Sequence, residues 1–129
     1  MQGKTKFNHI AIQVKDLEES GRFYEEVLEL KLIPEPFRDG LHLWFEIGEN
    51  LSLHLIKSEA PLILPGKDTH FCYSMTDLDA FMKRLDALDV FYGNWEGEHK
   101  KITLRSDGIR QIFFQDPNGY WLEANDDYR

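Results

Sequence analysis

Four side chains of metal-binding type occupy related positions in the two halves of this sequence. His9 and His70 each begin an extended apolar stretch that an Asp-Leu pair follows. His54 and Glu123 stand near the end of each half, after turn residues at corresponding places. Imidazole and carboxylate groups suit a divalent transition metal that keeps positions open for water or substrate. The residue types and their repetition therefore predict a metal site formed by His9, His54, His70 and Glu123.

Each of these residues also has an ordinary structural explanation. A histidine on a strand is most often a hydrogen-bonded or surface residue, and a glutamate near a C-terminus is usually solvated. The repeat favours the functional interpretation, because the four donors fall at two pairs of equivalent positions. His42 and His99, by contrast, have no equivalent donor in the other half.

The repeat also predicts the elements that position these donors. In each half, an alternating strand leads to a helix, which Asp16 caps in the first half and Thr76 or Asp77 caps in the second. The strong strand candidates that follow are residues 41–47, 51–56, 109–114 and 120–124, and the weaker ones are residues 31–33, 90–92 and 102–104. The pattern predicts an α+β fold made of two βαβββ modules.

The pleat of the strands decides which side chains lie together, since residues two apart share a face. The apolar residues of the first strand define the face that covers the helix, which leaves His9 on the opposite face. The same parity places the other three donors away from the helices: His54, His70 and Glu123. If a curved mixed sheet wraps this face into a cup, the four donors line the cup.

Length and composition limit the organisation of the chain. Its 129 residues, 42% of them apolar, suffice for one domain with a core. We expect a single domain over residues 1–129, built of a module at residues 7–57, a connector at residues 58–67 and a module at residues 68–125. The single cysteine, Cys72, excludes an internal disulfide and every site that needs several cysteine ligands.

Charge and hydropathy exclude several classes of partner. The 23 acidic and 15 basic side chains give a formal net charge of -8 at pH 7, which disfavours nucleic acids and anionic membranes. No apolar stretch has the length of a signal peptide or of a membrane span. We expect a soluble cytoplasmic protein with a small-molecule substrate.

The sequence around the four donors resembles the vicinal-oxygen-chelate superfamily, which includes glyoxalase I, bleomycin-resistance proteins and extradiol dioxygenases. The resemblance extends from about Phe7 to Asn125 and is strongest from Phe113 to Glu123, where the turn reads Asp-Pro-Asn-Gly. It implies paired βαβββ modules around a metal, commonly within a homodimer, with His9, His70 and Glu123 as ligands. At His54 glyoxalase I has a glutamate, so this histidine is either a fourth ligand or a general base.

The resemblance also implies a reaction class. Superfamily members use a divalent metal to bind two neighbouring substrate oxygens and to stabilise negative charge. We expect a lactoylglutathione lyase-like enzyme with Zn, Ni, Mn or Fe, in which Glu123 can also serve as a base. Its substrate would be a small oxygen-rich metabolite or a thiol adduct, changed by isomerase, lyase or thiol-transfer chemistry.

Two alternatives remain open. One is an Fe(II) extradiol-type dioxygenase, because two histidines and a carboxylate form the ligand set of such enzymes. The other is a metal-free, bleomycin-resistance-like protein that binds a drug-like compound between aromatic walls.

Overall fold

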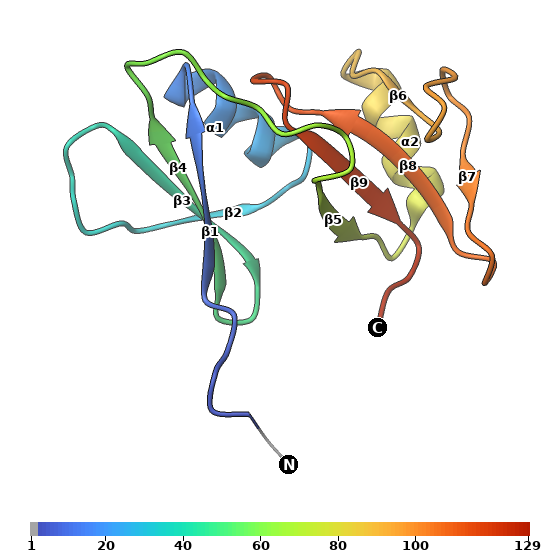
Figure 1. Cartoon of the computed structure of the whole chain (residues 1–129), viewed down its shortest axis with the longest axis horizontal. Helices are drawn as coiled ribbons and strands as arrows, with labels where there is room; N and C mark the ends of the chain where they lie inside the picture. The colour runs from blue at the N-terminus through green and yellow to red at the C-terminus, as the bar shows by residue number, and fades with distance from the viewer. Residues whose placement is uncertain (1–2) are drawn as a thin grey trace. The chain divides into compact units, whose positions relative to one another are not determined.

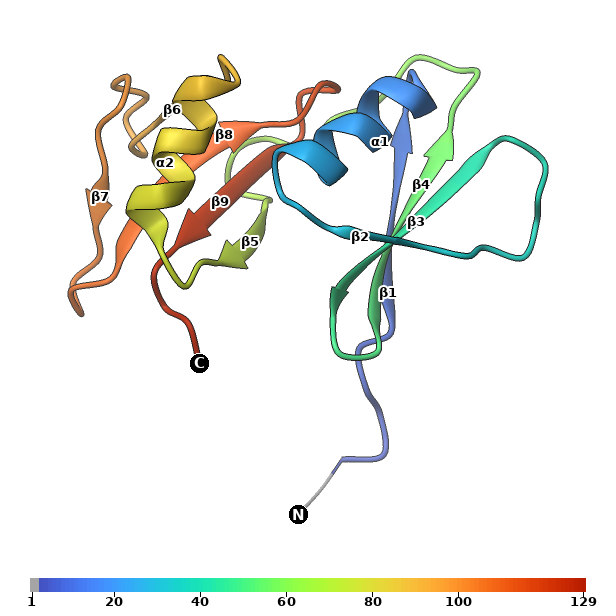
Figure 2. The same cartoon turned by 180° about the vertical axis from the view of Figure 1, so that it is seen from behind.

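A computed structural model describes residues 3–129, which form two compact units, one ending at Ile63 and the other running from Leu64 to Arg129. Each unit contains one mixed sheet and one helix (Figures 1 and 2). The mixed α+β class predicted from the sequence is confirmed. Among the described residues, no helix has the length and apolar character needed to cross a membrane.

The first unit holds a four-stranded sheet in the order β1-β4-β3-β2. Its strands are β1 (His9–Val14), β2 (Lys31–Ile33), β3 (His42–Gly48) and β4 (Leu51–Lys57). β1 runs parallel to β4, whereas β3 is antiparallel to both β4 and β2. Helix α1 (Leu17–Glu26) connects β1 to β2 and packs on β3 and β4. Val14, Leu53 and Leu55 are at most 1% exposed and form part of the core of this unit.

The second unit repeats this arrangement in the order β5-β9-β8-β6, with β7 also paired to β8. Its elements are β5 (Phe71–Ser74), α2 (Leu78–Ala87), β6 (Tyr92–Gly93), β7 (Thr103–Leu104), β8 (Arg110–Gln115) and β9 (Trp121–Asn125). β5 is parallel to β9, and β9 is antiparallel to β8. Leu85, Ile112 and Leu122 are fully buried in its core.

Both helices begin where the sequence predicts. The Asp16 carboxylate accepts a hydrogen bond from the Glu19 backbone N–H at 2.9 Å, and Asp77 accepts one from Ala80 at 2.9 Å. Each aspartate thereby satisfies a backbone donor that the first turn leaves unpaired. Of the two candidates for the second cap, Asp77 takes the position and not Thr76.

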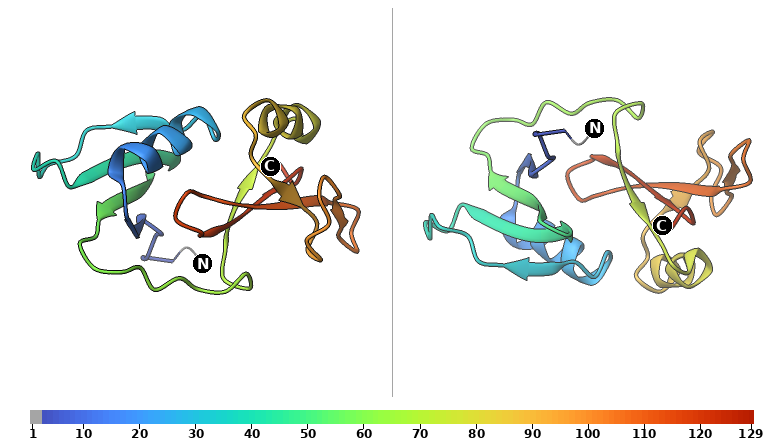
Figure 3. Two further views of the ribbon diagram at one scale, coloured as in Figure 1. Left: turned by 90° about the horizontal axis from the view of Figure 1, so that it is seen from above. Right: turned by 90° about the horizontal axis from the view of Figure 1, so that it is seen from below.

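The second unit has one strand more than a βαβββ module. β6 pairs with the end of β8 through Tyr92 and Phe114, and β7 pairs with its beginning through Leu104 and Arg110. Together these two short strands take the sheet edge that β2 alone occupies in the first unit. The longer segment between α2 and β8 supplies the extra strand (Figure 3).

Asp126 ties the end of β9 to the beginning of β8. Its carboxylate accepts hydrogen bonds at 2.9 Å from both the backbone N–H and the guanidinium of Arg110, which also contacts Asp79 of α2. The bonds from Arg110 hold the pKa of Asp126 below its usual value. A carboxyl group with a lowered pKa stabilises the fold above its unfolded-state pKa, and this contribution is lost as the pH falls through the folded-state pKa.

We therefore expect Asp126→Asn to lower the free energy of unfolding by at most about 1 kcal/mol at neutral pH, because the pair is partly solvated. The difference from wild type should shrink between about pH 5 and about pH 2, as the wild-type carboxylate becomes protonated. Urea unfolding across this range measures it. Glu25→Gln on the exposed side of α1 is the control, and a pH-independent difference for Asp126→Asn would contradict the assignment.

Candidate functional site

His70 and Glu123 meet in the second unit. His70 directly precedes β5, and the parallel pairing of β5 with β9 sets Cys72 opposite Glu123. This register brings Nε2 of His70 to 3.0 Å from Oε1 of Glu123. The side chain of Glu123 is 7% exposed and that of His70 is 23% exposed. Two of the four predicted donors are therefore neighbours in a largely buried position.

Both nitrogens of His70 face groups that only accept hydrogen bonds. Nδ1 lies 2.9 Å from the backbone carbonyl oxygen of Lys67 and donates to it. Nε2 faces a carboxylate oxygen of Glu123, so either a proton on Nε2 or a cation bound to both atoms satisfies this pair. Metal-binding histidines typically donate their other N–H to a carbonyl or carboxylate, as His70 does.

The second carboxylate oxygen of Glu123 is held by two side-chain amides. Oε2 accepts hydrogen bonds from Gln111 at 3.0 Å and from Asn125 at 3.1 Å. Burial alone would raise the pKa of Glu123, but hydrogen bonds from Gln111, Cys72, Asn125 and His70 outweigh it and hold the pKa below its usual value. The carboxylate is therefore ionised at neutral pH and fixed in direction.

Sequence reasoning did not include Gln111 among the site residues. Asn125 shares the face of Glu123 by strand parity, which the sequence does reveal. Gln111 contacts Glu123 because it lies opposite Asn125 in the β8–β9 register. The sequence alone does not reveal this register.

Cys72 supports this group without being reactive. Desolvation and a hydrogen bond to Glu123 raise the pKa of the Cys72 thiol to about 12. Its sulfur also accepts a hydrogen bond from the Asn125 amide at 3.2 Å. A thiol that stays protonated at neutral pH is a poor nucleophile.

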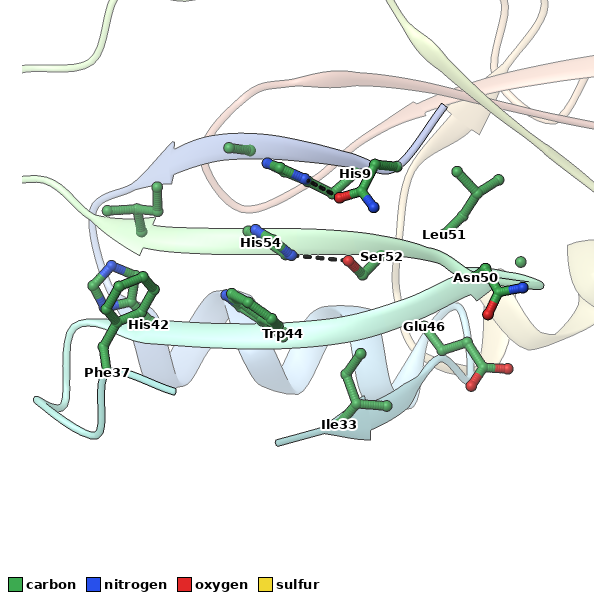
Figure 4. Close-up of a pocket in the computed structure, with 14 residues that line it drawn as sticks. His9, Ile33, Phe37, His42, Trp44, Glu46, Asn50, Leu51, Ser52 and His54 are labelled. Atoms are coloured by element: carbon green, nitrogen blue, oxygen red, sulfur yellow. Dashed lines mark hydrogen bonds between the residues drawn. The ribbon is translucent and has the colours of Figure 1, made fainter. Parts of the chain in front are cut away.

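The other two predicted donors, His9 and His54, lie together in the first unit (Figure 4). The His54 imidazole stacks on the Trp44 indole, with ring centroids 3.8 Å apart and planes 2° from parallel. On its other side it stacks on His9, with centroids 4.2 Å apart. The strand register brings these rings together, because Trp44 lies opposite His54 and His9 lies opposite Ser52, two residues before His54 on β4. The rings leave His54 only 9% exposed.

The stacked rings line a cavity of about 750 Å³ on the sheet face opposite α1. Phe37, from the segment between β2 and β3, stacks on His42 at 4.3 Å and adds a further aromatic wall. The remaining lining is partly apolar and partly polar, and includes Ile33, Ile56, Leu51, Glu46, Asn50 and Ser52. We call this space the ring-lined cavity.

Hydrogen bonding and charge set the state of the histidines in the ring-lined cavity. Burial, followed by the charges of His9 and His42, lowers the pKa of His54, so its ring is neutral at neutral pH. Nε2 of His54 lies 2.8 Å from the Ser52 hydroxyl. Nδ1 of His9 lies 2.6 Å from the side-chain oxygen of Asn8 and donates to it, which leaves the His9 Nε2 lone pair for another partner.

The Trp44 indole contributes an unsatisfied donor. Within the described part of the chain, its Nε1 atom is buried and has no hydrogen-bond partner. Leaving such a donor unpaired costs about 1–3 kcal/mol.

Comparison with known proteins places the chain in a family. A family model described as "Glyoxalase/Bleomycin resistance protein/Dioxygenase superfamily" matches residues 6–124. The chain belongs to this superfamily. It is 25% identical to Glyoxylase I 4 of Arabidopsis thaliana, over 92% of this chain and 69% of the relative. It is also 28% identical to a lactoylglutathione lyase of Pseudomonas putida, over 92% of this chain and 83% of that protein.

Solved structures of the Glyoxalase/Bleomycin resistance protein/Dioxygenase superfamily type share the fold. The structure titled "Oxidase ChaP-H2" matches with a TM-score of 0.79 and 24% sequence identity, covering 95% of this chain and 94% of that chain. At this identity the likeness shows the fold alone.

In this superfamily member, the predicted donors form two pairs, one in each unit. His9 contacts His54, and His70 contacts Glu123. Across residues 3–129, no group of three or more His, Cys, Asp or Glu side chains is arranged to hold a metal ion. His42 lines the ring-lined cavity although the repeat gives it no equivalent, whereas His99 stacks on Phe91 of the second unit at 4.6 Å.

Proposed function

We propose that the chain is a divalent-metal-dependent, glyoxalase-like enzyme acting on a small oxygen-rich molecule or a thiol adduct. The observation that carries the proposal is the His70–Glu123 pair, in which Nε2 lies 3.0 Å from a carboxylate oxygen in a largely buried position. A divalent ion bound to both atoms would take the place of the proton that bridges them in the metal-free protein. The membership of the superfamily and the relatives named lactoylglutathione lyase support an enzymatic role.

The donor set of the second unit fits a metal ion. Donors about 2.1 Å from one ion and 3.0 Å from each other subtend about 90° at it, as neighbouring positions of an octahedron do. The carbonyl of Lys67 and the amides of Gln111 and Asn125 supply the outer hydrogen bonds that orient such ligands.

We propose His9, His54, His70 and Glu123 as metal-binding residues. The proposal rests on the sequence repeat and on the pairing of the donors inside each unit. A bound divalent ion, Zn, Ni, Mn or Fe, would supply Lewis-acid stabilisation of negative charge on substrate oxygens. His54, neutral and close to Ser52, would either complete the ligand set or accept a proton from substrate, and Glu123 is the second candidate base.

The ring-lined cavity is the proposed substrate site in the first unit. Its volume of about 750 Å³ lies within the range of small-molecule sites. The aromatic side chains of Phe37 and Trp44 in its lining suit a flat unsaturated group. We further expect the working protein to be a homodimer.

The same rings favour a second candidate function, the metal-free binding of a flat aromatic compound. Phe37 and Trp44, whose rings meet edge-on with centroids 6.2 Å apart, would supply the walls. This candidate function needs no metal ligand at His70 or Glu123. Replacing those residues should therefore abolish the metal-dependent function and leave aromatic binding unchanged.

Metal content tests the proposal. Purified wild-type protein, dialysed against Zn, Ni, Mn or Fe(II) salts, should retain about one ion per chain. His9→Ala and Glu123→Ala should each lose it, whereas the matched control His99→Ala should keep it. Wild-type protein that takes up none of these ions would rule out the metal-dependent function and leave aromatic binding, which tryptophan fluorescence quenching by flat compounds would then measure.

A further inference from the structure

We propose that the ring-lined cavity takes a flat molecule whose polar end is an amine or a hydroxyl group and not an acid, and that Glu46 sets this selectivity. The inference deepens the proposed function, because the role of the cavity as the substrate site rests on that function. It narrows the substrate class to molecules without a free acid beside Glu46, which disfavours adducts of acidic thiols such as glutathione.

The ring-lined cavity has an aromatic end and a polar end (Figure 4). At the aromatic end Phe37 stacks on His42, and Ile56 lies opposite His42 in the β3–β4 register. At the polar end, close to the turn that joins β3 to β4, Glu46 lies opposite Ser52. Glu46 follows His42 by four positions along β3, which places the two ends about 13 Å apart. A molecule that fills the cavity therefore needs an apolar part and a polar part.

The carboxylate of Glu46 is available to a bound molecule. Glu46 lies on the cavity face together with Trp44, because the two residues are two positions apart on β3. Glu46 is exposed, and its carboxylate carries a negative charge at neutral pH. Lys31 lies opposite Glu46 in the β2–β3 register, but no ion pair joins Glu46 to a basic side chain within residues 3–129.

The lining offers no positive side chain that would hold an acid. None of the described residues that line the ring-lined cavity is a lysine or an arginine. In the same unit, Arg22 pairs with Glu18 on α1 at 3.0 Å, and Lys6 lines a different pocket together with Glu49. An acidic group that leaves water for the polar end would therefore meet the carboxylate of Glu46 and no lysine or arginine, which disfavours its binding.

An amine or a hydroxyl group suits the same position. A carboxylate accepts hydrogen bonds and donates none, so Glu46 favours a partner that carries an N–H or O–H donor. The side chains of Asn8, Asn50 and Ser52 also line the cavity and add further hydrogen-bonding groups. A charged ammonium group gains most, because hydrogen bonds between ionised partners are stronger than neutral ones. This selectivity concerns the group beside Glu46 and is separate from any oxygens that a metal ion would bind.

Isothermal titration calorimetry with three probes of similar shape tests the inference: 2-naphthylmethylamine, 2-naphthalenemethanol and 2-naphthoate. The full chain is dialysed against EDTA and measured at about pH 8, where imidazoles are mostly neutral. We expect wild type to bind the amine and the alcohol more tightly than the carboxylate. Glu46→Gln should reduce the amine-to-carboxylate affinity ratio about tenfold, because the charge attracts one probe and repels the other. Glu46→Lys should reverse the order.

Two further variants are the controls. Glu25→Gln removes the same charge from α1, outside the cavity lining, and should leave the affinity ratio unchanged. Phe37→Ala should weaken the binding of all three probes by a similar factor, which places them in the ring-lined cavity. Probes that Phe37→Ala does not affect would lie elsewhere and would overturn the inference.

Three other results would also overturn the inference: no binding of any probe, tighter binding of the carboxylate by wild type, or an unchanged ratio in Glu46→Gln. The metal content of the protein separates this outcome from failure of the proposed function. A chain that retains a metal ion but lacks the selectivity overturns the inference alone. Selective binding by a chain that takes up no metal ion supports the inference and overturns the metal-dependent function instead.

Discussion

Glu123→Gln should reduce divalent-metal affinity at least about 100-fold while leaving the fold nearly as stable as wild type. Loss of an outer-shell partner costs 10–100-fold in affinity, so loss of a charged ligand belongs at or beyond the upper end of about 100-fold. The fold is spared because the new amide fits the existing partners. Its oxygen can accept from Gln111 and Asn125 in place of Oε2, and its N–H₂ can donate to Nε2 of a neutral His70 ring.

The measurement pairs two experiments on the same variant. Competition titration with Co²⁺ gives the affinity, and urea unfolding of the metal-free protein gives the stability, which should stay within about 1 kcal/mol of wild type. Glu49→Gln in the exposed turn after β3 is the control for loss of one negative charge. Equal Co²⁺ affinity for wild type and Glu123→Gln would exclude Glu123 as a ligand. A large loss of stability would show that the carboxylate serves the fold instead.

Gly93→Ala should destabilise the second unit by about 2–3 kcal/mol, the upper part of the range for overpacking. A Cβ atom at Gly93 would lie 2.5 Å from the backbone oxygen and 3.1 Å from the backbone carbon of Glu98. These atoms belong to the segment that folds back along β6, where the Lys100 N–H donates to the Tyr92 carbonyl at 2.9 Å. Backbone cannot move aside as a flexible side chain does, so the segment must shift or the hydrogen bond must break.

Thermal and urea unfolding measure this effect, and Gly66→Ala is the matched control. A Cβ atom at Gly66 meets nothing within 4 Å, so this change should be neutral or slightly stabilising by restricting the unfolded chain. Wild-type stability in Gly93→Ala would mean that the segment around Glu98 does not pack against β6 as described.

Much of the fold is readable from the sequence because its signals are local. Asp16 and Asp77 cap their helices as predicted, since a side-chain acceptor three residues before a free backbone N–H needs no tertiary information. Alternation along a strand likewise assigns each residue to a face. His54 and Glu123 lie on the faces that parity predicts, although both are buried there.

The rest of the candidate site depends on register and on contacts between distant segments. Gln111 reaches Glu123 only because β8 and β9 pair with one particular alignment. The Lys67 ammonium group lies over the rings of Trp95, Phe113 and Trp121, and these four residues come from separate segments that share no periodicity. The contact of Trp44 also depends on register, because the β3–β4 pairing lays its indole flat on His54.

Two short strands, β6 and β7, share the edge of the sheet beside β8, and this disfavours wrong pairing with another chain. β6 and β7 are two residues long each, and β2 at the corresponding edge of the first unit has three. An incoming strand needs a continuous row of free backbone donors and acceptors to extend a sheet, and edges this short do not offer one. Dividing this edge between β6 and β7 therefore disfavours edge-to-edge aggregation. Lengthening β6 and β7 into one uninterrupted strand would expose a continuous edge that another chain could pair with.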